Sequence, residues 1–260
     1  MSVTYHYRMF RVINVFFGIS LLFPVWCSAS VYVEYTGDVL PEANNPPFTY
    51  VPASLDDSPS VGGGILTFPN TRSTGSHDYY RQEAMYVEDL VVQQFRVRLI
   101  DPVESSNSIY RGARTQLEFG DDANPGLGIM VFVLKDEVRL RQLDRGNIHN
   151  SFWVQESVAL DTTVFHTYTV VKHSTDTIRL YIDGRLAIDQ PIRSVAGTWR
   201  YGGEQRFSVN PSATTEWDFF RYAIGDDALD RLPVPEPTTL STMLLIFAAT
   251  GRAFVGPRCS

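Results

Sequence analysis

Cysteine is almost missing from this chain, which has only Cys27 and Cys259 among its 260 residues. One lies in each terminal segment, so the long middle of the sequence contains no thiol. That absence excludes a disulfide framework, a cysteine-ligated zinc site and a cysteine nucleophile from the middle of the chain.

Positive charge is also scarce once the two ends are set aside. Arg8, Arg11, Arg252 and Arg258 lie in the terminal stretches and no acidic residue does, so residues 31–237 keep 18 basic against 29 acidic side chains, a net charge of −11. A surface of this sign repels phosphate backbones. We therefore expect no nucleic-acid partner.

Several catalytic and metal-binding motifs are missing as well. The histidines lack a His-x-x-x-His spacing, and no Gly-x-Ser-x-Gly elbow or βαβ pattern occurs. Gly62-Gly63-Gly64 precedes no helix, so we interpret it as a bend and not as a phosphate cradle. We interpret His166 as a fold residue at the start of a strand.

The first 30 residues have the features of a secretory signal peptide in the expected order. Arg8 and Arg11 come first without an acid, a mostly apolar stretch covers 12–27, and the small residues 28–30 follow. We expect signal peptidase to remove residues 1–30. The mature chain then begins near Val31.

Two other interpretations of this segment stay open. An uncleaved membrane anchor is one, although Asn14 and Pro24 weaken the stretch as a span. A lipid-modified Cys27 is the other, and it is disfavoured because Trp26 stands where a small residue is needed.

The C-terminal end has the composition of a sorting tail. A proline-rich hinge at 232–237 precedes the apolar run 240–249, and Arg252 and Arg258 come last. Basic residues after an apolar run favour transient membrane contact with the charged end in the cytoplasm. The run is about half the length of a full span, and a frayed terminus with a chance apolar patch is the alternative.

One motif in this tail is specific. Val234, Pro235, Glu236 and Pro237, followed by the tail to 260, resemble a PEP-CTERM sorting signal. The resemblance implies an exosortase-type enzyme as partner and an address at the cell envelope, the outer surface or the extracellular matrix of a Gram-negative bacterium. We therefore divide the chain into a signal peptide (1–30), one domain (31–232) and a sorting tail (233–260).

The middle of the chain has the period of β-strands. Apolar and polar residues alternate in 31–35, 94–100, 115–119 and 137–141, while 128–134 is nearly all apolar and is expected to be central. Turn clusters separate them, including 121–126 and 201–203, and 41–64 is expected to be irregular. Short strands with regular turns favour an all-β antiparallel two-sheet β-sandwich.

The segment from His166 to Ile192 is the strongest fold signal. Three alternating runs are joined by the loop 174–177 and by Asp183-Gly184, the dipeptide best suited to a two-residue type I′ turn. This predicts an antiparallel meander.

That meander resembles the diagnostic segment of laminin-G-like domains, in which an His-x-Tyr strand leads into an apolar-Tyr-apolar-Asp-Gly hairpin. Here His166, Tyr168, Tyr181, Asp183 and Gly184 fill those places. The strand 216–222 matches the closing strand that runs beside the first. The resemblance implies a concanavalin A-like jelly roll, a fold that hosts lectins, glycosidases, adhesion modules and structural spacers.

Glycoside hydrolases of that superfamily place their carboxylates on one strand as Glu-x-Asp-x-x-Glu. The nearest match begins at Glu216 and Asp218 but has Arg221 in the third place, and an arginine does not deliver a proton. We therefore predict no catalytic residue and expect Glu216, Asp218 and Glu204 to be solvated or paired with arginines; the pairs expected involve Arg200, Arg206 and Arg221.

Calcium is the one metal that the resemblance suggests, because such domains often hold Ca²⁺ with carboxylate and carbonyl oxygens. The candidate ligands are Asp121, Asp122 and Asn124 in one loop and Asp226 and Asp227 after the last strand. Solvated turn residues are the alternative interpretation.

A sugar-binding surface needs exposed aromatic rings on which sugars stack. Trp153, Trp199 and Tyr201, together with Tyr79-Tyr80, are candidates near expected loops, although aromatic residues in a sandwich more often lie in the core. Trp217 is expected in the core.

The sequence thus predicts an exported, non-catalytic surface module that binds glycan or another surface polymer. A structural or adhesion protein without a small ligand and a diverged glycoside hydrolase are the alternatives.

Overall fold

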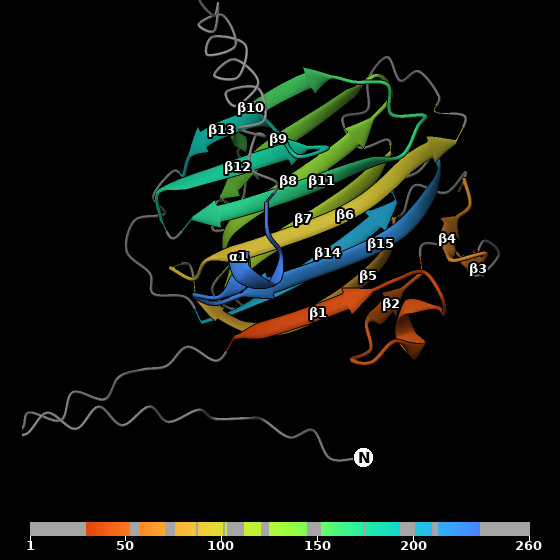
Figure 1. Cartoon of the computed structure of the whole chain (residues 1–260), viewed down its shortest axis with the longest axis horizontal. Helices are drawn as coiled ribbons and strands as arrows, with labels where there is room; N and C mark the ends of the chain where they lie inside the picture. Colours follow the sequence, from red (N-terminus) through yellow and green to blue (C-terminus); the bar gives the residue numbers. More distant parts are fainter. Residues whose placement is uncertain are drawn as a thin grey trace, which may run out of the picture.

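The computed structural model describes residues 30–52, 58–70, 76–86, 88–100, 102, 112–120, 125–144, 152–173, 175–192, 201–209 and 213–234. Within these residues the protein has fifteen strands, the short 3-10 helix η1 (Pro41–Ala43) and the single helical turn α1 (Ala228–Arg231). The strands form two antiparallel sheets that lie face to face (Figure 1). The predicted fold class, an all-β two-sheet sandwich of jelly-roll type, is confirmed.

One sheet, here called sheet A, has eight strands. They are β1 (Val31–Tyr35), β3 (Ser60–Gly62), β4 (Ile65–Phe68), β6 (Val91–Ile100), β11 (His166–His173), β12 (Thr177–Ile182), β13 (Arg185–Pro191) and β15 (Thr214–Ile224). The order across the sheet is β13–β12–β11–β6–β15–β4–β3. Strand β1 pairs with the second half of β15, and β4 pairs with the first half.

The other sheet, sheet B, has seven strands in the order β10–β9–β8–β7–β14–β5–β2. They are β2 (Thr49–Val51), β5 (His77–Tyr86), β7 (Ala113–Gly120), β8 (Pro125–Leu134), β9 (Glu137–Asp144), β10 (Phe152–Ala159) and β14 (Tyr201–Val209).

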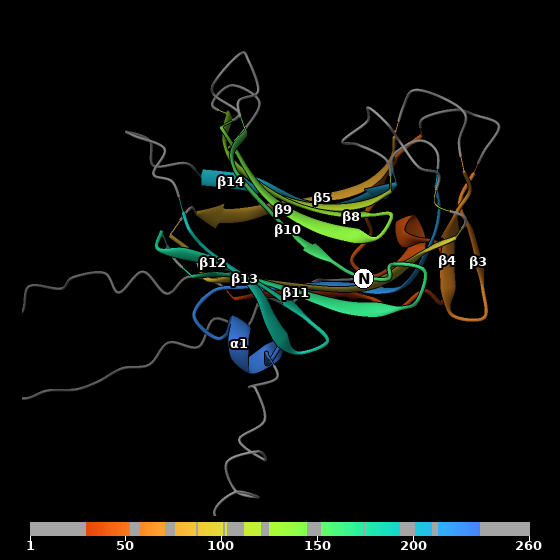
Figure 2. The same cartoon turned by 90° about the horizontal axis from the view of Figure 1, so that it is seen from above.

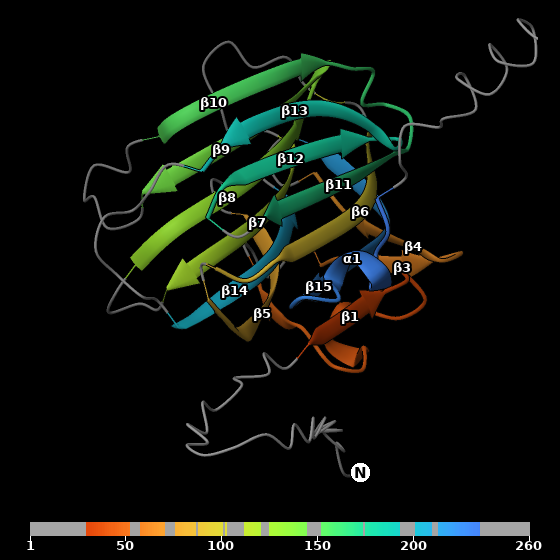
Figure 3. The same cartoon turned by 60° about the vertical axis from the view of Figure 1, so that its left-hand side comes forward.

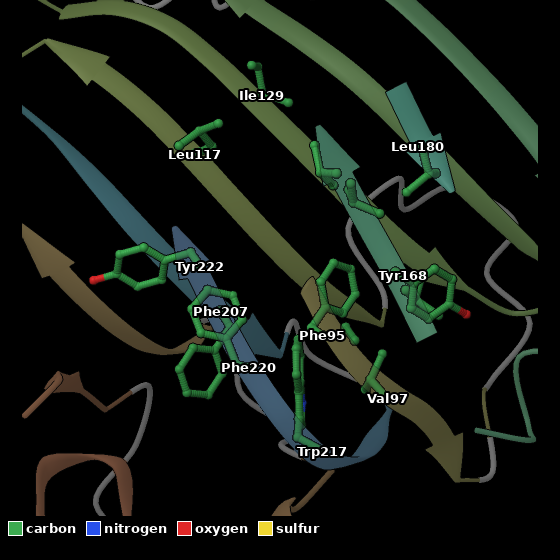
Figure 4. Close-up of a cluster of buried hydrophobic side chains, with 14 of the residues drawn as sticks. Phe95, Val97, Leu117, Ile129, Tyr168, Leu180, Phe207, Trp217, Phe220 and Tyr222 are labelled. Carbon is green, nitrogen blue, oxygen red and sulfur yellow. The ribbon is translucent and has the colours of Figure 1, made fainter. Parts of the chain in front are cut away.

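The core between the sheets is rich in aromatic rings (Figure 4). Phe207 of sheet B stacks on Phe220 of sheet A with ring centroids 4.6 Å apart, and its centroid lies 5.3 Å from that of Trp217. Phe95 and Tyr168 stack at 5.0 Å on neighbouring strands. Trp217 is fully buried, as the sequence predicted. These rings hold the sheets together because each buries a large apolar area.

Polar side chains also bridge the two sheets inside this core. Each bridge joins one residue of sheet A to one of sheet B: Gln93 with Gln205 at 2.9 Å, Gln190 with Gln142 at 3.1 Å, and the Tyr222 hydroxyl with the Glu83 carboxylate. Buried polar groups that are paired in this way fix one relative placement of the sheets.

The predicted meander is confirmed as β11, β12 and β13. Asp183 and Gly184 have φ angles of +48° and +77°, which is the pair of left-handed residues that a type I′ turn requires. The closing strand is confirmed as well, because β15 pairs with β1 along Val31–Tyr35.

Three local expectations are wrong. Tyr201–Gly203 was expected to be a turn but begins β14, opposite Tyr86–Glu83 of β5 with a register shift. Tyr79 and Tyr80 lie inside β5 and not at a loop. Residues 41–64, expected to be irregular, contain η1, β2 and β3.

Sheet B curves away from sheet A at both ends, so that its outer face is concave, while α1 lies on the opposite side of the molecule, against the outer face of sheet A (Figure 2). There α1 contacts β1, β6 and β15 (Figure 3), and Ala228 and Leu232 bury Val92, Val171 and Ala223. Among the described residues no helix is long and apolar enough to cross a membrane.

Candidate functional site

The concave face of sheet B carries an unusual number of buried polar groups. On β5, β7 and β14 every second residue, such as Tyr79, Leu117 and Phe207, points into the core, so the residues between them point to the concave face. Those that form the feature called here the polar band are Asp78, Arg114, Gln116, Glu118, Glu204 and Arg206.

The polar band is recessed. Asp78, Gln116 and Glu118 are only 6%, 3% and 7% exposed. An outer sheet face is normally wet and its charged side chains are mostly exposed. Charges are kept at such depth only where partners offset the loss of water.

A network of ion pairs crosses the polar band. Arg114 binds Asp78 at 3.0 Å, and its Nε donates to the Ser208 hydroxyl at 3.0 Å. Arg206 binds Glu204 at 2.5 Å and lies 3.5 Å from the other Asp78 oxygen. Two guanidinium groups therefore hold two carboxylates in fixed orientations, since bidentate and shared pairs restrict rotation.

Glu118 and Glu204 are direct partners in the register between β7 and β14. Residues that face each other in this way have Cβ atoms about 5 Å apart. Gln116 occupies the same relation to Arg206. The centre of the concave face thus presents two neighbouring carboxylates, an amide and a guanidinium.

Aromatic and apolar side chains lie next to the polar band on the concave face of sheet B. Tyr80 faces Arg206 in the register of β5 with β14, and the guanidinium lies 5.7 Å from the Tyr80 ring centroid. On β8 and β9 a second apolar cluster is formed by Met130, Phe132, Leu134 and Leu143. Arg141, 2% exposed, lies 5.0 Å above the Phe132 ring.

The carboxylates that resemble the glucanase motif lie on the other side of the molecule. Glu216 and Asp218 of β15 are on the outer face of sheet A, where they bind Arg98 and Arg96, each at 2.6 Å. Both guanidinium groups lie against the Phe165 ring.

Arg221 follows on the same face. It binds Glu34 at 3.1 Å and donates to Gln94 Oε1 at 2.8 Å. Glu204 binds Arg206, one of the three arginines that the sequence offered as partners. Glu216 and Asp218 do not bind the expected Arg206 or Arg221, because β15 pairs with β6 and β6 carries Arg96 and Arg98. Arg200 lies outside the described residues.

Of the calcium candidates, the structure describes only Asp226 and Asp227. Asp226 and Asp227 follow β15, and Asp227 binds Arg231 at 2.8 Å. Within the described residues no three metal-ligating side chains gather at one point. Asp121, Asp122 and Asn124 lie outside the described residues, and calcium stays a prediction.

The aromatic and sorting candidates are only partly placed. Trp153 lies in β10 and Tyr201 in β14, and the structure describes the backbone but not the side chain of each. Trp199 is not among the described residues. Val234 packs against the apolar cluster beneath α1. Pro235, Glu236 and Pro237 lie beyond the described residues, as do residues 1–29.

Comparison with known proteins gives a likeness of fold. No family model matches the chain, and no curated protein matches it significantly. Among solved structures, a Bacillus licheniformis β-glucanase has a TM-score of 0.49 and 11% identity over 74% of this chain and 97% of its own.

Two further solved structures are also similar to this chain. The CBM2 module of an evolved Dit protein from Lactobacillus casei BL23 phage J-1 has a TM-score of 0.49 and 10% identity over 75% of this chain and 95% of its own. The carbohydrate recognition domain of Emp47p has a TM-score of 0.43 and 14% identity over 65% and 86%. At TM-scores below 0.5 and identities of 10–14%, these similarities go no further than a general likeness of fold.

Sequence reasoning missed the polar band. Glu118 was seen only as part of an alternating strand, and Glu204 was expected to be solvated or paired with an arginine and was given no role in a site. A usable signal was present in Arg114-Thr-Gln-Leu-Glu118, where a basic, an amide and an acidic residue recur with the period of one strand face.

Proposed function

We propose that this chain is an exported, non-catalytic module that binds a glycan on the concave face of sheet B. The observation that carries the proposal is the polar band, in which buried carboxylates and guanidinium groups are held in fixed orientations on an outer, concave sheet face. Burying charge on an outer face costs solvation free energy, and a ligand that binds to the aligned groups would offset that cost.

The chemistry of the band suits a polyhydroxylated ligand. Carboxylates such as Glu204 accept hydrogen bonds from sugar hydroxyls, and guanidinium groups such as that of Arg206 donate to hydroxyl and ring oxygens. Tyr80 adds an aromatic ring on which the apolar face of a sugar can stack, which is the usual mixture in a small-ligand site. The acidic excess of the domain disfavours polyanionic partners.

The N-terminal signal and the C-terminal tail would direct the protein to its location. We propose that signal peptidase removes the N-terminal signal and that an exosortase-type enzyme acts at Val234–Pro237, which places the module at the cell envelope, the outer surface or the extracellular matrix of a Gram-negative bacterium. Intact-mass measurement of the protein from its native host is the test. We expect neither the N-terminal signal nor the tail beyond about Pro237, and a mass that includes Met1 or Ser260 contradicts the proposal.

Binding is tested on a glycan array with the processed chain, with and without Ca²⁺. We expect retained glycans to be lost in Glu204→Gln and in Tyr80→Ala. Glu216→Gln is the matched control, because Glu216 also binds an arginine, at 2.6 Å, but on the opposite face. Equal binding by Glu204→Gln and Glu216→Gln contradicts the site. An array with no retained glycan favours the structural or adhesion alternative.

One observation favours a second candidate, a diverged glycoside hydrolase. Glu118 and Glu204 are direct cross-strand partners, and hydrolysis with retention needs two carboxyl groups about 5–5.5 Å apart. We expect no release of reducing sugar, because Glu204 is committed to Arg206. Release that disappears in Glu118→Gln and persists in Glu216→Gln, Asp218→Asn would establish the hydrolase in place of the binder.

A further inference from the structure

Ser30, the first described residue, is part of the folded module. Its hydroxyl accepts a hydrogen bond from Arg231 Nη2 at 2.9 Å. Its backbone lies against Gly225, where a Cβ would come within 3.2 Å of the Ser30 Cα. The next residue, Val31, is already paired with Ile224 in sheet A. Ser30 is therefore held in the fold by its side chain and its backbone.

Asp227 lies at the same corner and has an unused oxygen. Its Oδ2 accepts from Arg231 Nε at 2.8 Å, so Asp227 and Ser30 bind the same guanidinium. Its Oδ1 is shielded from solvent and has no hydrogen-bond partner among the described residues. A shielded acceptor without a donor is costly and uncommon in native proteins.

The backbone nitrogen of Ser30 lies at the same corner as this carboxylate, because Ser30 and Asp227 bind the same Arg231 guanidinium. It is 3.8 Å from the point where a Cβ on Gly225 would be, and Gly225 stands two residues before Asp227. A positive charge on that nitrogen would face an acidic segment, since Asp226 and Asp227 are adjacent.

The sequence allows two cuts for the export signal. A signal peptidase needs small residues near its cut, and both Ala29 and Ser30 satisfy this. A cut after Ser30 removes the hydrogen bond to Arg231 and the contact with Gly225. A cut after Ala29 keeps both and leaves a new α-amino group on Ser30.

We propose that the export signal is removed after Ala29, one residue before the boundary expected from the sequence, and that the resulting α-ammonium of Ser30 binds Asp227 Oδ1. Hydrolysis breaks the bond between the Ala29 carbonyl carbon and the Ser30 nitrogen, and water supplies the carboxylate oxygen and the amine hydrogen. The amine is mostly protonated at pH 7. Removal of the signal thus completes the fold. The inference rests on the proposed export and is independent of glycan binding.

The test compares thermal unfolding at pH 7 of chains that all end at Ser260. One begins at Ser30, one has a single glycine before Ser30, and one begins at Val31. We expect the Ser30 chain to melt about 2–4 °C above the other two, the shift typical of one added ionic hydrogen bond in a domain of this size. The advantage over the glycine-extended chain should vanish in Asp227→Asn and remain in the control Asp226→Asn.

N-terminal sequencing of the exported protein completes the test, and Ser30 is the residue expected. Equal melting temperatures of the Ser30 and glycine-extended chains, an advantage that survives Asp227→Asn, or an exported chain that begins at Val31 each overturn the inference. A chain that retains Met1 overturns the proposed export as well. An empty glycan array together with the expected melting temperatures overturns the proposed binding alone.

Discussion

The imidazole Nδ1 of His166 lies 2.6 Å from Oδ2 of Asp183, seventeen positions further along the chain. The other oxygen of Asp183 accepts the Thr167 amide at 2.9 Å, and the Asp183 amide donates to the Thr167 carbonyl at 2.8 Å. The His166 Nε2 lies 2.9 Å from the Asp161 carbonyl oxygen. The start of β11 and the turn between β12 and β13 are therefore fastened to each other.

Asp183→Ala should lower the free energy of unfolding by about 1–2 kcal/mol, because two hydrogen bonds to its carboxylate are lost and alanine resists positive φ. Asp183→Asn is the control, since asparagine tolerates the left-handed region and keeps an acceptor. It should cost clearly less. Urea unfolding of both variants checks this, and equal costs would contradict a role for the left-handed backbone.

Gly184→Val tests the turn from its other residue. The φ angle there is +77°, and a β-branched side chain is a marked outlier at such an angle. We expect a loss of about 1–3 kcal/mol in the free energy of unfolding. A substitution without measurable effect would contradict the type I′ turn.

Because of Lys172, the free energy of unfolding should increase as the pH rises from about 8 to about 10. The side chain is fully buried, its Nζ lies 4.7 Å from the Phe119 ring centroid, and it donates to the Asp89 carbonyl. Burial lowers the pKa of Lys172 to about 8 against the opposing effect of Asp89 and Glu88, while in the unfolded chain the pKa is about 10.4.

The sign follows from the protons bound. Below pH 8 the ammonium is charged in both states, so the folded state bears the full cost of its burial. Between pH 8 and 10 the unfolded chain binds more protons, and stability rises with pH, by about 3 kcal/mol over the whole interval. Above pH 10 tyrosine has the opposite effect: burial raises the pKa of Tyr168, so the unfolded chain loses that proton first and stability falls with pH. Urea unfolding at pH 7.5, 8.5 and 9.5 should show the rise, and Lys172→Met should remove it.

Glu83 and Glu216 should differ in their contribution to stability although both bind arginine. Glu83 has a side chain 7% exposed and also accepts from the Tyr222 hydroxyl across the sheets. Glu83→Ala leaves the buried Tyr222 hydroxyl and the partly buried Arg81 guanidinium without this acceptor and should cost about 2–4 kcal/mol. Glu216→Ala breaks a half-exposed pair and should cost about 0–1 kcal/mol. Thermal unfolding of both variants measures the contrast, and equal costs would contradict the buried bridge.

The sequence determined the features that depend only on neighbouring residues. Alternation in 31–35 and 137–141 marks β1 and β9 because one face of each strand packs in the core. The turn at Asp183-Gly184 could be predicted because its backbone angles demand those residue types. The two ends stay predictions, since they lie almost wholly outside the described residues.

Strand β5 shows where the pattern failed. Its core-facing positions include Arg81 and Glu83, which satisfy each other and Tyr222 inside the molecule. Charged residues at core positions break the apolar period on which strand prediction depends. The same holds for β14, where the fully buried Gln205 bonds to Gln93 of the other sheet.

Only the tertiary structure decided which carboxylates share a surface. Glu216 and Glu204 look alike in the sequence, yet one binds Arg98 on the outer face of sheet A and the other lies in the polar band of the concave face of sheet B. Strand order and register bring together residues that are far apart in the chain, such as Glu118 and Glu204. A local pattern contains no information on that pairing, because it is set by the packing of both sheets around one core.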